Sequence, residues 1–200
     1  MREEIENRLA LNLGRVGNLI RVYEGLSGKG QGRRPVHSSD ILRAATVLLH
    51  ATVEDFLRSI ELWKLPAGSE EALSDIPLVG TQGRPDRLSL GKLTPHRTKS
   101  VDTVIMESVA QYLERKSYND TTDVMVALQR LGIDSSGLKA HLPQLSSLIE
   151  RRHHIVHQAD REKGSGSGHH PARSISKGAV LSWLEAVKAG TSAVLSVTPD

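Results

Sequence analysis

The stretch that decides the fold class is residues 40–60, DILRAATVLLHATVEDFLRSI. Within it and just beyond it, apolar residues recur at steps of three and four: Leu49, Val53, Phe56, Ile60 and Trp63. This spacing gathers them on one face of a helix, and that face has to be covered by other parts of the chain. Ser38 or Ser39 can cap its start, so we expect a long core helix over about 39–64.

The same helical periodicity returns on both sides of this segment. Residues 4–26 carry one stripe, made of Ile5, Leu9, Leu13, Val16, Ile20 and Tyr23. Further helices are expected over 101–115, 122–131, 138 to about 162, and about 175–196, the last with the stripe Val180, Leu184, Val187, Thr191 and Val194. No segment shows the alternation or the valine-rich run of a strand. We therefore predict an all-α fold, an antiparallel helical bundle of four main helices plus shorter ones.

Two segments interrupt the helical pattern. Residues 66–100 contain four prolines and no periodicity, which predicts a long irregular insertion after the second helix. Residues 163–174 include GSGSGHHP, the composition of a flexible loop, and its Gly/Ser part at 164–168 can be natural or an engineered replacement. A chain of 200 residues can bury one core, so we expect a single domain over 1–200.

Composition limits the classes of function. With 26 Lys and Arg against 23 Asp and Glu, the net charge of +3 permits a nucleic-acid partner without requiring one. The absence of cysteine excludes disulfides, thiolate metal sites and cysteine nucleophiles, and it fits a reducing compartment. The first residues lack the apolar core of a signal peptide, and no run approaches the roughly 18 apolar residues of a membrane span. We expect a cytoplasmic protein with no membrane partner.

The motif ERRHHIVHQAD, residues 150–160, concentrates charge in the helix expected over 138–162. By their spacing, the core positions of this helix are Leu142, Leu145, Ile149 and Val156. Arg152 lies between two of them and should point inward or into a groove. His157, five residues on, lies about 140° around the axis and should reach the edge of the same groove, with His153 one turn before it. A guanidinium at such a seam needs a carboxylate, which Glu54 or Asp55 could supply.

Three interpretations of the motif compete. In the first, the charged residues simply cover a solvated helix face. In the second, His153 and His157 bind a metal, and Glu150 with His153 copies half of a di-iron site; the second Glu-x-x-His of such a site is missing, so we expect no metal and no other cofactor. In the third, an imidazole moves protons and a guanidinium stabilises the phosphorane during cleavage of RNA by its own 2′-hydroxyl.

The segment Arg152-His-His-Ile-Val-His157 resembles the motif of the HEPN family, an Arg, four to six residues, then a His in a late helix of an all-α bundle. Residues 40–60 resemble the long early helix of the subgroup called RiboL-PSP-HEPN, and the likeness covers roughly residues 35–196. The resemblance implies a metal-independent endoribonuclease, often a toxin or an antiviral effector with an antitoxin or defence-system partner. The alternative within the family is a non-catalytic module that binds nucleotides, RNA or proteins.

By this resemblance, Arg152 stabilises the transition state and His157 acts as the general base or acid, with His153 beside it. Arg151, also within the family's spacing, and Arg161 are expected to contact RNA. The family's toxins that are silenced by a nucleotidyltransferase often carry Tyr two residues after the His, where this chain has Ala159. One chain supplies one Arg and one His, whereas attack by a 2′-hydroxyl is best served by a base and an acid on opposite sides of the phosphorus. We therefore expect a homodimer whose 142–160 helices face each other across the active-site groove.

Overall fold

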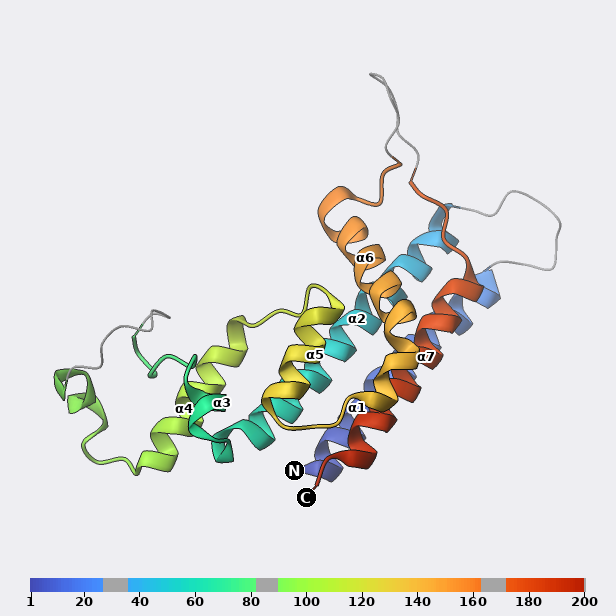
Figure 1. Cartoon of the computed structure of the whole chain (residues 1–200). Helices are drawn as coiled ribbons and strands as arrows, with labels where there is room; N and C mark the ends of the chain where they lie inside the picture. The colour runs from blue at the N-terminus through green and yellow to red at the C-terminus, as the bar shows by residue number, and fades with distance from the viewer. Residues whose placement is uncertain (27–35, 82–89, 163–171, 200) are drawn as a thin grey trace.

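All regular elements of the computed structural model are helical (Figure 1). The structure describes residues 1–26, 36–81, 90–162 and 172–199. Its α-helices are α1 (Arg2–Leu26), α2 (Val36–Lys64), α3 (Glu70–Leu73), α4 (Val101–Arg115), α5 (Thr121–Arg130), α6 (Leu142–Gln158) and α7 (Lys177–Val197), and its 3₁₀ helices are η1 (Leu65–Ala67), η2 (Leu90–His96) and η3 (Ser136–His141). Among these residues the only extended pairing is an isolated bridge between Arg161 and Ala172. The all-α prediction is confirmed.

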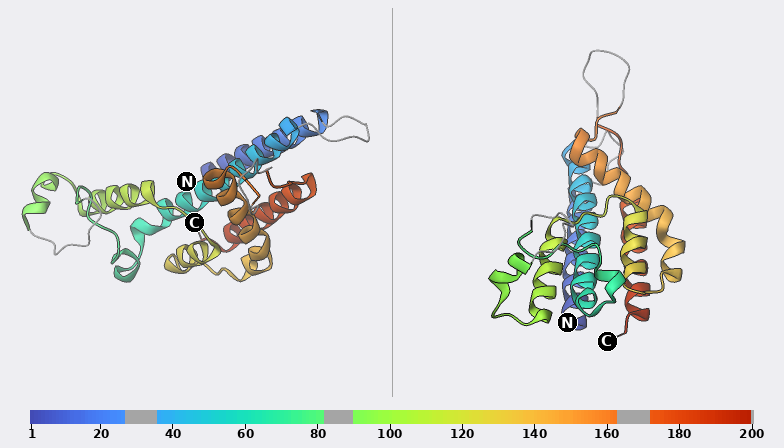
Figure 2. Two further views of the ribbon diagram at one scale, coloured as in Figure 1. Left: turned by 90° about the horizontal axis from the view of Figure 1, so that it is seen from above. Right: turned by 60° about the vertical axis from the view of Figure 1, so that its left-hand side comes forward.

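Helix α2 is the element around which the others pack. It contacts α1 along its length, and it also contacts α6, α7 and α4 (Figures 1 and 2). The stripe read from residues 40–60 is buried, with Leu49 and Ile60 fully covered. The expected cap is wrong, because α2 begins at Val36 and places both Ser38 and Ser39 inside the helix. Ser38 is itself buried there.

The predicted irregular insertion at 66–100 contains short helical turns in its described part. Helix α3 is capped by Ser69, whose side chain accepts from the Ala72 N–H, and η2 precedes α4. Figures 1 and 2 show α3, η2 and α4 at one end of α2, well away from α7. This end has its own small core of Leu65, Ala72, Val109 and Leu113. The expected flexible loop at 163–174 lies outside the described residues, except for 172–174.

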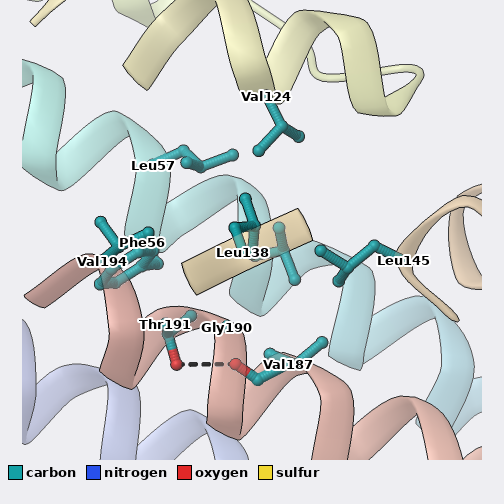
Figure 3. Close-up of a pocket in the computed structure, with 10 residues that line it drawn as sticks. Phe56, Leu57, Val124, Leu138, Leu145, Val187, Gly190, Thr191 and Val194 are labelled. Atoms are coloured by element: carbon teal, nitrogen blue, oxygen red, sulfur yellow. Dashed lines mark hydrogen bonds between the residues drawn. The ribbon is translucent and has the colours of Figure 1, made fainter. Parts of the chain in front are cut away.

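The main core lies between α1, α2, α5, α6 and α7. Figure 3 shows the part of it where α2, α5, α6 and α7 meet. Its side chains leave a cavity of only about 20 Å³, lined by Val53, Phe56, Leu57, Val124, Leu138, Leu145, Val187, Gly190, Thr191 and Val194. The buried hydroxyl of Thr191 is satisfied by a hydrogen bond that it donates to the carbonyl of Val187 at 2.8 Å. Gly190 lets η3 approach α7, since a Cβ there would lie 2.6 Å from Leu138 Cδ1.

Helix α7 supplies the C-terminal side of this core. Every residue of the stripe predicted for it, from Val180 to Val194, is buried. By length and composition alone α7 could also cross a membrane, but half of its most apolar 18 residues are buried inside the fold. A core helix of a globular protein passes the same test, so this feature is weak evidence for a membrane span.

The helix expected over 138 to about 162 is divided and shorter. Residues Ser136–His141 form η3, and α6 starts at Leu142 with Pro143 in its first turn, where the missing N–H of proline does no harm. Helix α6 ends at Gln158. The expectation that Val156 belongs to the core is wrong: Val156 is 48% exposed, because the buried stripe of α6 ends at Ile149.

Candidate functional site

The motif 150–160 ends in an unusual backbone turn. Ala159 and Asp160 have φ angles of 49° and 55°, the left-handed region that residues other than glycine seldom occupy. The N–H groups of both residues converge on the carbonyl of His154, the second at 3.0 Å. This turn closes α6 and directs the side chain of Asp160 back into the protein.

The buried carboxylate of Asp160 joins three parts of the chain. Its Oδ2 accepts from Arg43 Nε of α2 and from Arg151 Nη2 of α6, both at 2.7 Å, and its side chain is 1% exposed. Its backbone carbonyl accepts from the N–H of Arg173 at 2.7 Å. The carbonyl of Arg173 in turn accepts from Arg43 at 2.7 Å and Arg151 at 3.0 Å. We call Arg43, Arg151, Asp160 and Arg173 the Asp160 cluster.

Arg151 makes structural contacts within this cluster, and its expected contact with RNA stays a prediction. Its side chain is 14% exposed and forms an ion pair with the carboxylate of Asp160. Burial lowers the pKa of Arg151, as do the positive charges of Arg173 and Arg43, whereas Asp160 raises it. Arg161 is exposed, as an RNA contact would need, and its role stays a prediction.

Arg152 has a different environment from its neighbour. It is half-buried, and within the described part of the chain it makes no hydrogen bond or ion pair. The structure shows neither of the expected pairings, because both carboxylates have other partners. Glu54 accepts from the N–H of Tyr118 and lies 3.6 Å from Arg58, and Asp55 is paired with Arg8 of α1 at 3.0 Å. The two carboxylates follow each other on α2, so they project about 100° apart.

His50 of α2 is a residue near Arg152 that the sequence analysis missed. It is 1% exposed, its Nε2 lies 3.3 Å from the carbonyl of Tyr118, and its Nδ1 is buried with no partner among the described residues. Burial lowers the pKa of His50; Glu54 acts in the opposite direction, and the charge of Arg152 adds to the lowering. The charge of Arg152 therefore lies close enough to His50 to affect its pKa. A histidine inside the apolar run of 40–60 was the available signal.

The outer side of the motif carries two adjacent imidazoles. The rings of His153 and His157 are exposed, with centroids 4.6 Å apart. Val156 lies between them on the helix and is exposed as well. His154 projects from another face, where its Nδ1 lies 3.0 Å from Gln158 Oε1. We call Arg152, His153, Val156 and His157 the α6 surface.

These groups can bind an anion and transfer protons. The guanidinium of Arg152 makes no hydrogen bond or ion pair with the described residues, so it can donate to an anion, and an imidazole side chain can take up and release a proton. In the described ranges, no three His, Asp or Glu residues are grouped closely enough to hold a metal ion. Comparisons with protein-family models, with curated proteins and with solved structures found no match to this chain.

Proposed function

We propose that the protein is a metal-independent, HEPN-type endoribonuclease that acts as a cytoplasmic homodimer. The observation that supports this most is the half-buried Arg152, which has no anionic partner among the described residues and stands beside an exposed pair of histidines. A guanidinium in such a position is stabilised when an anion reaches it. In this proposal α1, α2, α6 and α7 make up the antiparallel four-helix bundle.

The reaction uses two imidazoles and one guanidinium. One imidazole takes the proton of a 2′-hydroxyl, whose oxygen then forms a bond to the neighbouring phosphorus. The bond from phosphorus to the 5′-oxygen breaks, and the second imidazole gives a proton to that leaving oxygen. Arg152 stabilises the negative charge of the phosphorane. The products are a 2′,3′-cyclic phosphate and a 5′-hydroxyl, and His157 is the first candidate for base or acid.

The homodimer accounts for the exposure of Val156. This residue lies one turn from Arg152 and between the two histidines, so a two-fold axis through the α6 surface would bury it and bring a second Arg and His to the site. Val156→Glu should therefore give a monomer by light scattering at tens of micromolar protein. Val126→Glu, on α5, changes a valine that is 54% exposed and should leave the dimer intact. A monomeric wild-type protein would refute this part.

Cleavage of a mixed RNA pool in EDTA tests the activity. We expect products with cyclic-phosphate ends, and we expect Arg152→Ala and His157→Ala each to lower the rate by at least about 100-fold. His154→Ala, on another face of the same helix, is the matched control and should cleave at close to the wild-type rate. An intact RNA pool with wild-type protein would favour the non-catalytic binding module instead.

The biological role follows from the same proposal. An RNA-cleaving protein of this kind acts as a toxin or antiviral effector and needs an antitoxin or another defence-system partner. A partner that modifies a tyrosine after the motif is disfavoured, because the corresponding position is Ala159, held in the left-handed turn. Co-purification with the product of an adjacent gene would test for the partner.

A further inference from the structure

A second polar pocket lies on a different face of α6 from the α6 surface. It has a volume of about 320 Å³ and is formed by α6, the segment 173–176 and the start of α7. The side chains that matter for its chemistry are Glu150, Arg151, His154, Arg173, Ser176 and Trp183. This volume is at the lower end of small-molecule sites, so the pocket suits a small ligand and not a polymer.

Some hydrogen-bond donors of the pocket residues have no partner in the described part of the chain. Arg151 Nε is buried and has no partner among the described residues. Within the same part of the chain, the side chain of half-buried Arg173 makes no hydrogen bond or ion pair, and the indole N–H of Trp183 has no acceptor. A buried donor such as Arg151 Nε is normally satisfied, so its position beside the pocket indicates a missing acceptor.

The charges around the pocket also favour an anion. Arg43 and Arg151 share the one carboxylate of Asp160, whereas the side chain of Arg173 has no carboxylate partner among the described residues. Burial lowers the pKa of Arg151, and the nearby charges of Arg173 and Arg43 lower it further. The pocket's own carboxylate, Glu150, is 73% exposed and can turn into water. The N-terminus of α7, a helix of 21 residues, adds a positive end at Ser176.

We propose that this pocket binds a small phosphate monoester. The phosphate group would lie between Arg173, the Nε of Arg151 and the start of α7, because guanidinium groups match phosphate oxygens in geometry and charge. The organic part would contact the apolar wall made by Ile175, Ala179 and the ring of Trp183. The site is separate from the proposed RNA site and does not rest on the proposed ribonuclease activity.

The two tryptophans of the chain make a local test possible. Inorganic phosphate is titrated at constant ionic strength, with chloride as the comparison, and the indole N–H resonances are followed by NMR. We expect a saturable shift of the Trp183 resonance only, because Trp63 lies at the end of α2, outside the pocket. Phenyl phosphate should bind several-fold more tightly than phosphate, since its ring covers the apolar wall.

Variants separate this site from general attraction of anions. Arg173→Ala should weaken phosphate binding by about tenfold or more, because it removes a charged donor. Arg161→Ala removes an exposed arginine outside the pocket and should change binding by less than about twofold. Arg152→Ala should leave the Trp183 shift unchanged, whatever the ribonuclease assay shows.

Three results would overturn the proposal. The first is a Trp183 resonance that shows no saturable shift up to about 20 mM phosphate. The second is equal binding by the wild type and Arg173→Ala, and the third is equal loss in Arg173→Ala and Arg161→Ala. Because the Arg173 side chain makes no hydrogen bond or ion pair with the described residues, its variant should fold and keep the Trp183 resonance that reports binding.

Discussion

Replacing Asp160 by Asn should lower the free energy of unfolding by about 3–5 kcal/mol, the usual loss when one partner of a buried ion pair is removed. Asparagine has nearly the same shape, so it leaves no cavity. It removes the charge, however, that Arg43 Nε and Arg151 Nη2 share at 2.7 Å, and it leaves two guanidiniums close together in a site that is 1% exposed. At about 2–4 °C per kcal/mol for a chain of this size, Tm should fall by roughly 6–20 °C.

The matched control is a substitution of Asp40, a second carboxylate that pairs with Arg43. Asp40 contacts Arg43 Nη1 at 3.0 Å, but its side chain is 64% exposed. Exposed ion pairs contribute about 0–1 kcal/mol, so Asp40→Asn should be almost neutral. Urea unfolding of both variants at pH 7, followed by circular dichroism, measures the difference. Equal losses in the two variants, or a loss below about 1 kcal/mol in Asp160→Asn, would refute the argument that burial makes this carboxylate important.

Two further predictions concern the core. Gly190→Val should lower the free energy of unfolding in urea by about 1–3 kcal/mol, because its Cβ would lie 2.6 Å from Leu138 Cδ1. Gly17→Val, with nothing within 4 Å, should change it by less than about 0.5 kcal/mol. Equal effects of the two substitutions would contradict the packing argument. His50 has a lowered pKa in the folded state, so the unfolded state binds protons more readily, and stability should be full above about pH 6.5 and decline as pH falls towards the folded pKa. The decline between pH 7 and 5.5 should be smaller in His50→Gln, and an unchanged decline would show that other groups cause it.

Helical periodicity predicted the elements whose apolar stripes are complete. Helices α1, α4 and α7 have nearly the expected bounds. The stripe of α7 is buried as the spacing indicated, and so is the stripe of α1 except for Leu13, which is partly buried. The predicted bounds of α6 were wrong at both ends, and each error has a local cause in the sequence. Pro143 suits only a first helical turn, and the turn at Ala159 and Asp160 ends the helix without glycine or proline to announce it.

The orientation of the candidate site was harder to predict than its helix. Arg151 and Arg152 are adjacent, and periodicity places one of them inward, but the partner that decides their roles comes from another element. Asp160 selects Arg151, because the left-handed turn directs its carboxylate to that arginine and to Arg43 of α2. Val156 shares its helix face with Ile149, yet it is exposed where the buried stripe ends. Spacing along one helix contains no information about where the neighbouring helices stop.

The contact between the first and last helices has a consequence for synthesis on the ribosome. Arg2 donates to the carbonyls of Leu195 and Thr198 at 2.9 Å and 3.0 Å, the second of these 196 residues further along the chain. At about 5–20 residues per second, a ribosome needs roughly 10–40 s to make the segment between them. During that time α1 can pack against α2, but the side of α1 that contacts α7 in the folded protein stays uncovered. A nascent chain should therefore expose Leu9 and Leu13 to chaperones until the last helix emerges.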